Sequence, residues 1–339
     1  MPTDAKVIDG TGLTLTPGIW DSHKHVVSDA QGVMLLSVGV TSLRNPGAVM
    51  QPTALRNARI EKGELLFPMV YSSVGIDGKG PLQAQIAISV ASGEEAVAAV
   101  RSAKSGGFTA VKIYGSMRPE WLKSTIAEAK ELGLHVHGHV PATMRPADAV
   151  AAGYDEITHL NFVMMQAMPD SVVAVSNGLA RIQGPGRYAK DVDISAEPLK
   201  SLIAEMAAKK ITVDPTLAVF ERAYVAERGD VSPAYAPFVG TMPPLDERSF
   251  RTGGDAPPEG VTRSDYRASF TKMVQLTGAL HEAGVPIVAG TDGWGLEIVR
   301  ELELYVDAGL TPAEALQTAT IEPARLMGRS EERRVGKEC

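Results

Sequence analysis

The chain has almost no cysteine: the single residue of this type among 339 is Cys339, the last. This scarcity excludes both a disulfide framework and a zinc site built from cysteines. Any bound metal ion must therefore be held by His, Asp, Glu or a modified Lys. Histidine is scarce as well, with only seven residues, so the positions of these residues are informative.

The sequence also lacks any run of about 18 or more apolar residues, the length that a membrane-spanning helix needs. Its first ten residues show no charged start followed by an apolar stretch, which a signal peptide requires. The sequence thus indicates neither a membrane span nor a targeting signal. The compartment, cytoplasmic or exported, stays open, because a signal peptide could have preceded residue 1.

The charge balance argues against two classes of partner. A net charge of −7 gives no electrostatic reason to expect nucleic acid or an anionic membrane surface. A hydrophobic content of 44% and a charged content of 22% are typical of a soluble globular protein. We expect a small-molecule substrate, and homo-oligomer formation stays open.

Short β-rich runs alternate with amphipathic helical stretches along nearly the whole chain, a pattern typical of parallel βαβ units. The predicted helices include 94–105, 119–133 and 266–284. The predicted strands are 18–26, 39–45, 69–75, 108–115, 134–140, 155–160, 211–217 and 286–292. Eight strand and helix pairs fit one α/β (β/α)8 TIM barrel, over residues 17–328, better than two domains.

Two connections are predicted to be far longer than usual for such a barrel, 161–193 and 218–260. Both follow strands at the same end of the barrel. The second is rich in Pro and Gly and shows little helical period, so a lid over a substrate and plain surface decoration are both compatible with it.

Several histidines and other polar residues lie toward the ends of the predicted strands, which is where TIM barrels carry their active sites. These residues are His23 and His25 on the first strand, Lys112 and Tyr114 on the fourth, His139 on the fifth, His159 on the sixth and Asp292 on the eighth. If the first strand extends through the histidines, Asp21, His23 and His25 share one face. Imidazole and carboxylate ligands of this type suit Zn²⁺.

The motifs "VIDGTGLTLTPGIWDSHKHV", "HGHVP", "AAGYDEITHL", "VAGTD" and "GLTPAEALQTATIEPARLMG" resemble the amidohydrolase superfamily, in its imidazolonepropionase and prolidase-like branch. The resemblance covers about residues 7–328. It implies a site for one or two divalent metals, expected to be two Zn²⁺ ions. The implied ligands are His23, His25 and Asp292 for one metal, His139 and His159 for the other, and a carboxylated Lys112 between the two. His137 is then expected deeper in the barrel, His135 near its opposite rim and His281 at the surface.

The resemblance also implies a metal-dependent hydrolase of C–N bonds. A metal-bridged hydroxide would attack the carbonyl while Asp292 accepts a proton and returns it to the leaving nitrogen. Tyr114 either donates to the oxyanion or packs in the barrel. The most concrete form is a prolidase-like hydrolase of dipeptides or N-acyl amino acids. The alternatives are a hydrolase of cyclic amides like imidazolonepropionase, a lactonase, a phosphotriesterase and, in another class, an inactive metal-binding fragment.

The residues that select the substrate are harder to identify. Arginine has suitable geometry for a substrate carboxylate, and Arg44 is preferred because it ends a predicted strand. Tyr224 is the second predicted substrate contact. Arg181, Arg187 and Arg222 are weaker candidates on the long connections.

Three features depart from the family pattern. Lys24 stands between the paired histidines, where the family usually has an apolar residue, and it is expected to point toward the helical layer. Residues 1–16 are expected to be a remnant of a small β-sandwich domain that is otherwise missing. Residues 329–339, "RSEERRVGKEC", resemble a translated sequencing adapter and are expected to be a non-native tail, so the chain looks like a fragment.

Overall fold

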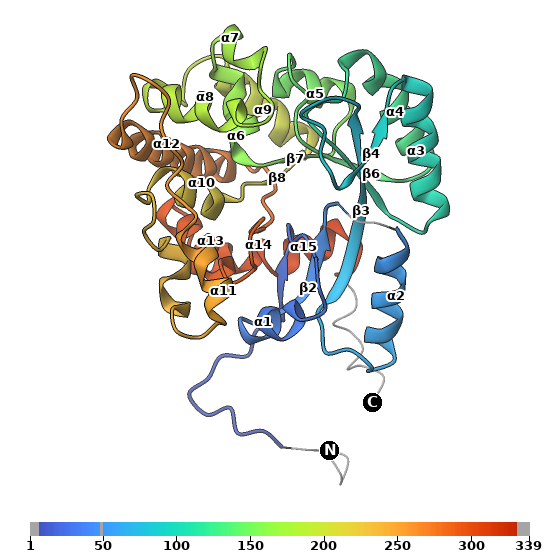
Figure 1. The fold of residues 1–339 in the computed structure, drawn as a ribbon, viewed down its shortest axis with the longest axis vertical. Helices are drawn as coiled ribbons and strands as arrows, with labels where there is room; N and C mark the ends of the chain where they lie inside the picture. The colour runs from blue at the N-terminus through green and yellow to red at the C-terminus, as the bar shows by residue number, and fades with distance from the viewer. Residues whose placement is uncertain (1–6, 48–49, 331–339) are drawn as a thin grey trace.

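The computed structural model describes residues 7–47 and 50–330, and most of the tail that we expect to be non-native lies outside these ranges. Parallel strands run side by side in the order β1-β2-β3-β5-β6-β7-β8, with helices around them (Figure 1). The strands are β1 (Ile19–Asp21), β2 (Val40–Asn45), β3 (Met69–Gly78), β4 (Ala87–Val90), β5 (Ala110–Ile113), β6 (His135–Gly138), β7 (Glu156–Thr158) and β8 (Thr212–Asp214). The predicted barrel class is confirmed.

Residues 286–292 join the two edges of this curved sheet. On one side Val288 N donates to Val213 O in β8 at 3.0 Å. On the other side Ser22 N donates to Ala289 O, and Asp292 N donates to His23 O, both at 2.7 Å. The predicted eighth strand therefore occupies its expected place between β8 and β1, although only Ile287 forms a regular bridge there.

Helices follow the strands and cover the outside of the sheet (Figure 1). They are α1 (Gln31–Ser37), α2 (Met50–Glu61), α3 (Gly93–Ser105), α4 (Pro119–Glu131), α5 (Pro146–Ala152), α9 (Leu199–Lys209), α12 (Arg263–Glu282), α13 (Ile298–Asp307), α14 (Pro312–Thr318) and α15 (Ile321–Leu326). Local sequence sets several of their starts: α4 begins with proline, and Thr262 and Asp265 form a capping box on α12. No helix in the described ranges is both long and apolar enough to cross a membrane.

The strands are buried on both sides, as expected for a parallel sheet under a helical layer. All four residues of β5 are buried, with Val111 and Ile113 fully inaccessible. Helix α4 contributes Leu122 and Ile126 to the same core. This packing leaves the polar side chains of the barrel confined to its interior and its two ends.

Both long connections contain several short helices, which differs from the prediction only for the second, whose sequence shows little helical period. The first contains α6 (Leu160–Met164), η1 (Met165–Ala167), α7 (Asp170–Val173), α8 (Ala180–Tyr188) and η2 (Ala189–Asp191). The second contains α10 (Leu217–Tyr224), η3 (Pro233–Phe238), α11 (Pro244–Glu247) and η4 (Arg248–Arg251). Tight packing explains α8 despite its internal Gly-Pro-Gly: a Cβ at Gly186 would lie 2.5 Å from the Tyr266 ring of α12.

Two further details differ from the predicted strands, of which the first was predicted over 18–26. Strand β1 ends at Asp21, so the paired histidines follow the strand instead of alternating along it. Asp21 accepts hydrogen bonds from His23 N at 3.0 Å, from Thr291 N at 3.0 Å and from Thr291 Oγ1 at 2.7 Å. The additional short strand β4 pairs with the end of β3.

A buried ion pair crosses the barrel interior. Arg44 at the end of β2 donates from Nη1 and Nη2 to the two carboxylate oxygens of Glu156 on β7, at 2.7 and 2.6 Å. Its Nε donates to Ser22 O at 2.9 Å. Both charged side chains are buried, so each depends on the other for compensation.

We therefore expect Arg44→Met to lower the free energy of unfolding by about 3–5 kcal/mol, because it leaves the Glu156 carboxylate buried without a counter-charge. The double variant Arg44→Met/Glu156→Gln removes that charge and should recover part of the loss. Arg101→Met, which removes an equally bidentate but exposed pair with Glu128, is the control and should have a much smaller effect. Denaturant unfolding measures all three, and equal losses for Arg44→Met and Arg101→Met would contradict the assignment.

Candidate metal centre

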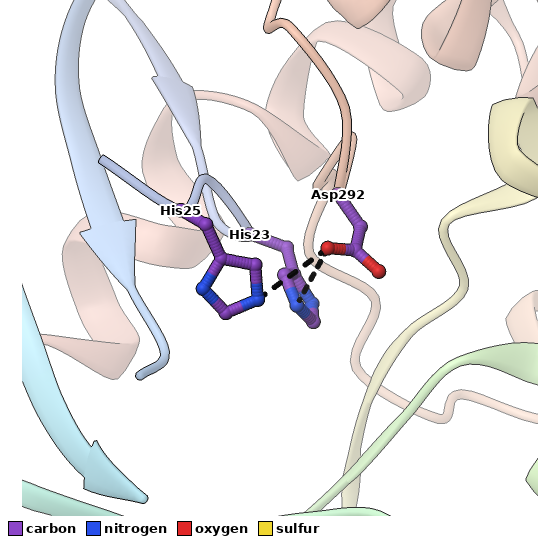
Figure 2. Close-up of side chains that lie close together, drawn as sticks. All are labelled: His23, His25 and Asp292. Atoms are coloured by element: carbon purple, nitrogen blue, oxygen red, sulfur yellow. Dashed lines mark ion pairs between the residues drawn. The ribbon is translucent and has the colours of Figure 1, made fainter. Parts of the chain in front are cut away.

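Three of the predicted ligands meet at the end of the barrel. His23 and His25 lie on the segment after β1, and Asp292 lies at the end of the segment that joins β8 to β1 (Figure 2). Asp292 Oδ1 lies 3.5 Å from His23 Nε2 and 3.4 Å from His25 Nε2. All three ligand atoms are within 4.8 Å of one another.

The spacing of these atoms fits a metal ion. Ligands about 2.1 Å from a tetrahedral zinc lie about 3.4 Å from one another. The observed separations of 3.5 and 3.4 Å match that value. Two imidazole nitrogens and a carboxylate oxygen are also the donor types that zinc accepts. Residues His23, His25 and Asp292 could therefore hold a divalent cation.

The remaining predicted ligands lie beside this group. Asp292 turns its second oxygen, Oδ2, toward His159 Nε2 at 3.6 Å. Lys112 Nζ lies 3.1 Å from His23 Nε2. The His139 ring is 5.0 Å from the His159 ring, measured between centroids. The structure thus brings all six predicted ligands to one place, with Asp292 between the two halves of the set.

Two of these residues have unusual backbone conformations. His159 has φ 67° and Asp292 has φ 47°, both in the left-handed region that ordinary L residues rarely adopt. Backbone hydrogen bonds hold both residues: His159 N donates to Asp214 O and Asp292 N donates to His23 O, each at 2.7 Å. Such strain is typical of functional sites, where side-chain direction matters more than local stability.

Burial sets the charge states of the histidines. Removal from water lowers the pKa of His23, His139 and His159 well below the usual value, and the positive charge of Lys112 lowers it further. Desolvation likewise lowers the pKa of His25 to about 4. The imidazoles are therefore neutral near pH 7, the form that binds metals.

Lys112 is the one cationic group of the cluster, and its side chain is 1% exposed. Desolvation lowers its pKa to about 8, partly opposed by the charges of Asp292 and Asp214. A lowered pKa increases the fraction of neutral amine, which is the form that reacts with CO₂. The position is therefore compatible with the carboxylated lysine that the sequence predicts.

Asp214, at the end of β8, is a member of the site that the sequence analysis did not identify. Its Oδ2 lies 2.6 Å from His23 Nδ1, and it is completely buried. When the carboxylate accepts the Nδ1 hydrogen, the lone pair of His23 Nε2 is free to accept from Lys112 Nζ, at 3.1 Å, or to bind a metal ion. A signal was available, because Asp214 is an acidic residue inside a predicted strand, where a charged side chain is unusual.

The two additional histidines of β6 do not join the cluster. His137 Nε2 lies 2.7 Å from Ser73 Oγ, inside the barrel. His135 Nε2 lies 3.0 Å from Glu156 Oε2. His137 is buried, and the His135 side chain is 23% exposed, so neither lies among the predicted ligands. His281 lies on α12, 3.6 Å from Glu314.

The structure does not bring the predicted substrate contacts to the cluster. The three guanidinium nitrogens of Arg44 donate to Glu156 and Ser22, as described above. Tyr224 is fully buried, and its hydroxyl donates to Ile182 O at 2.5 Å. Both side chains thus form hydrogen bonds inside the protein. This could not be foreseen from the sequence, because the partners are distant along the chain.

Tyr114 does lie at the site. Its ring centroid is 4.8 Å from the His139 ring and 4.8 Å from Lys112 Nζ. Within the described residues its buried hydroxyl has no hydrogen-bond partner. Desolvation raises the pKa of this hydroxyl, so it remains a proton donor at every accessible pH. Both predicted roles of Tyr114, donation to the oxyanion and packing in the barrel, are compatible with this position.

Solved structures with the same fold include several hydrolases. A bottromycin amidohydrolase has a TM-score of 0.67 and 23% identity, with 92% of this chain and 67% of that chain covered. A putative prolidase from Bifidobacterium longum has a TM-score of 0.61 and 23% identity, with 97% and 74% covered. A prolidase complexed with N-methylphosphonate-L-proline has a TM-score of 0.62 and 19% identity, with 97% and 79% covered.

No curated protein matches the sequence significantly. The family model for the amidohydrolases, in contrast, matches residues 14–337, nearly the whole chain. This match confirms the resemblance inferred from the motifs. Amidohydrolases are generally metal-dependent enzymes that act on small molecules, in agreement with the His-His-Asp cluster. The chain belongs to the amidohydrolase family and is a hydrolase.

Proposed function

We propose that the protein uses two zinc ions to hydrolyse C–N bonds in dipeptides or N-acyl amino acids. His23, His25 and Asp292 would hold one ion, His139 and His159 the other, and a carboxylated Lys112 would lie between the two. The observation that carries this proposal is the position of Asp292, whose two oxygens face different histidines, Oδ1 toward His23 and His25 and Oδ2 toward His159.

Access to solvent supports the same assignment. Asp292 and His25 retain 23% and 27% of their side-chain exposure, while His23 retains none. A substrate must therefore approach from the side of Asp292 and His25. A carboxylate that is both exposed and close to the ligands is well placed to exchange protons with a bound molecule.

The chemistry divides between the metal and the protein. A bound divalent cation polarises the scissile carbonyl and makes hydroxide available near neutral pH. Asp292 accepts a proton from the attacking water as the C–O bond forms, and it donates that proton to the nitrogen as the C–N bond breaks. The products are a carboxylic acid and an amine. Tyr114 would donate its unsatisfied hydroxyl to the developing oxyanion.

The choice of amide substrates rests on the prolidase-like motifs and on two similar structures that are named as prolidases. The second of these binds N-methylphosphonate-L-proline, in which a tetrahedral phosphonate is joined to an amino acid. A tetrahedral group next to an amino-acid nitrogen resembles the intermediate of amide hydrolysis. Cyclic amides, lactones and phosphotriesters remain the alternative substrates.

The first test is metal content. We expect two zinc ions per chain in the wild type and at most one in Lys112→Ala, because the bridging group is lost. Elemental analysis of gel-filtered protein measures both. Lys123→Ala, which changes an exposed lysine of α4, is the control and should keep the wild-type content. Less than one zinc per chain in the wild type would contradict the two-metal proposal.

The second test concerns Asp214. Asp214→Asn keeps the shape of the side chain but removes the charge that orients His23, so zinc affinity should fall by roughly 10- to 100-fold. Competition with a chromophoric chelator measures the dissociation constant. Asp193→Asn, at an exposed position, should leave that constant unchanged. Unchanged affinity in Asp214→Asn would show that Asp214 does not position His23.

The third test is activity. Zinc-loaded protein is screened against dipeptides, N-acyl amino acids, cyclic amides, lactones and phosphotriesters. We expect release of free amine from the first two classes, and a loss in kcat of roughly 10²- to 10⁴-fold in Asp292→Asn, since proton transfer is removed. Asp193→Asn again serves as the control. Turnover of lactones or phosphotriesters alone would refute C–N hydrolysis, and zinc binding without any turnover would favour the inactive fragment.

A further inference from the structure

Arg181 occupies a distinctive place at the mouth of the barrel, near the start of α8. Its backbone carbonyl accepts a hydrogen bond at 3.0 Å from Asn161, two residues after His159. The next carbonyl, that of Ile182, accepts from Tyr224 in α10, the helix that follows β8. Arg181 therefore lies over the carboxyl ends of β7 and β8, on the side of the site where His159 lies.

The same segment also reaches the end of β5. Asn177 Nδ2 donates to Ser116 Oγ at 2.9 Å, just beyond Tyr114. A Cβ added to Gly115 would lie 2.6 Å from Asn177 Oδ1, so the Asn177 side chain packs directly against the backbone of Gly115. Residues 177–182 thus span the strand ends that carry Lys112 and Tyr114 on one side and His159 on the other.

The charge of Arg181 has no counter-ion within the described parts of the chain. Its guanidinium forms one hydrogen bond, from Nη1 to Gly178 O at 3.2 Å, and no ion pair. The side chain is nevertheless partly buried. Arg44 pairs with Glu156, Arg145 with Asp170, Arg263 with Glu227 and Arg300 with Glu221, whereas the partly buried Arg187 and Arg222, like Arg181, form no ion pair within the described residues. A desolvated guanidinium without a carboxylate partner is unfavourable, unless a bound anion compensates its charge and accepts its hydrogen bonds.

The charge of Arg181 acts on the residues of the cluster. The guanidinium contributes to lowering the pKa of Lys112, His139 and His159. In return, Asp292 is the largest influence that opposes the desolvation of Arg181. Arginine stays protonated despite such desolvation. The site therefore has a permanent positive charge opposite the proton-transfer carboxylate.

We infer that Arg181 binds a carboxylate of the substrate and so makes the enzyme selective for amides that carry a free carboxylate near the scissile bond. This inference rests on the proposed function and narrows it. The planar guanidinium offers two parallel N–H groups to a carboxylate. N-acyl amino acids and dipeptides carry such a group next to the scissile nitrogen, whereas lactones and phosphotriesters do not.

Matched substrates test this selectivity. N-Acetyl-L-leucine and N-isopentylacetamide contain the same amide, but only the first has a carboxylate. We expect Arg181→Met to lower kcat/KM for N-acetyl-L-leucine by roughly 10- to 150-fold, mainly through KM, and to leave the value for N-isopentylacetamide unchanged. Arg181→Lys should lower kcat/KM for N-acetyl-L-leucine less, because lysine keeps the positive charge and lacks only the two parallel N–H donors of the guanidinium. Arg187→Met is the control on the same helix, where the side chain donates to Glu259 O at 2.6 Å.

A binding measurement separates this inference from the proposed function. Equilibrium dialysis of N-acetyl-L-leucine against metal-free protein needs no turnover, and we expect affinity to fall at least 10-fold in Arg181→Met but not in Arg187→Met. If the wild type cleaves neither substrate yet shows this difference in binding, the proposed function fails and the role of Arg181 stands. Equal binding by wild type and Arg181→Met, or equal losses on both substrates, would overturn the inference.

Discussion

The site depends on backbone hydrogen bonds that join the first and last strands of the barrel. Residues 286–292 bond to β8 on one side and to the segment after β1 on the other. The bond from Asp292 N to His23 O, at 2.7 Å, fixes a carboxylate from the end of the chain against a histidine from its beginning. Since the two residues are 269 positions apart (292 − 23), no local structure could place them together. Closure of the sheet is therefore what makes a ligand set from separate segments.

The charged and polar side chains inside the barrel lie at two levels. At its lower level Arg44 and Glu156 compensate each other completely. At the upper level burial keeps the histidines neutral, and Lys112 and Arg181 supply positive charge around Asp292. An interior of this kind costs stability, since each buried polar group must be compensated. The positive φ angles of His159 and Asp292 add to that cost. Buried polar groups and strained backbone that occur together at one end of a barrel are typical of a functional site.

Much of the fold and part of the site could be predicted from the sequence. The alternation of strands and helices predicts the barrel because each unit has its own apolar pattern. The paired histidines and later single histidines could be placed because they recur where strands end. The local sequence pattern does not predict a residue's role or its secondary structure where contacts with residues distant in the sequence determine them. Arg44 lies at the end of a strand, as site residues do, but it forms a buried ion pair with Glu156, 112 positions away in the sequence. Helix α8 contains Gly-Pro-Gly and is not predicted as a helix, because its packing against α12 outweighs low helix propensity.

The central claim is that His23, His25 and Asp292 are ligands of one metal ion. Anomalous scattering at the zinc absorption edge, measured on crystals of the zinc-loaded protein, tests it most directly. The account predicts a strong anomalous peak about 2.0–2.2 Å from His23 Nε2, from His25 Nε2 and from a carboxylate oxygen of Asp292. A loaded protein whose peaks lie only at other side chains, such as His135 or His281, would contradict it.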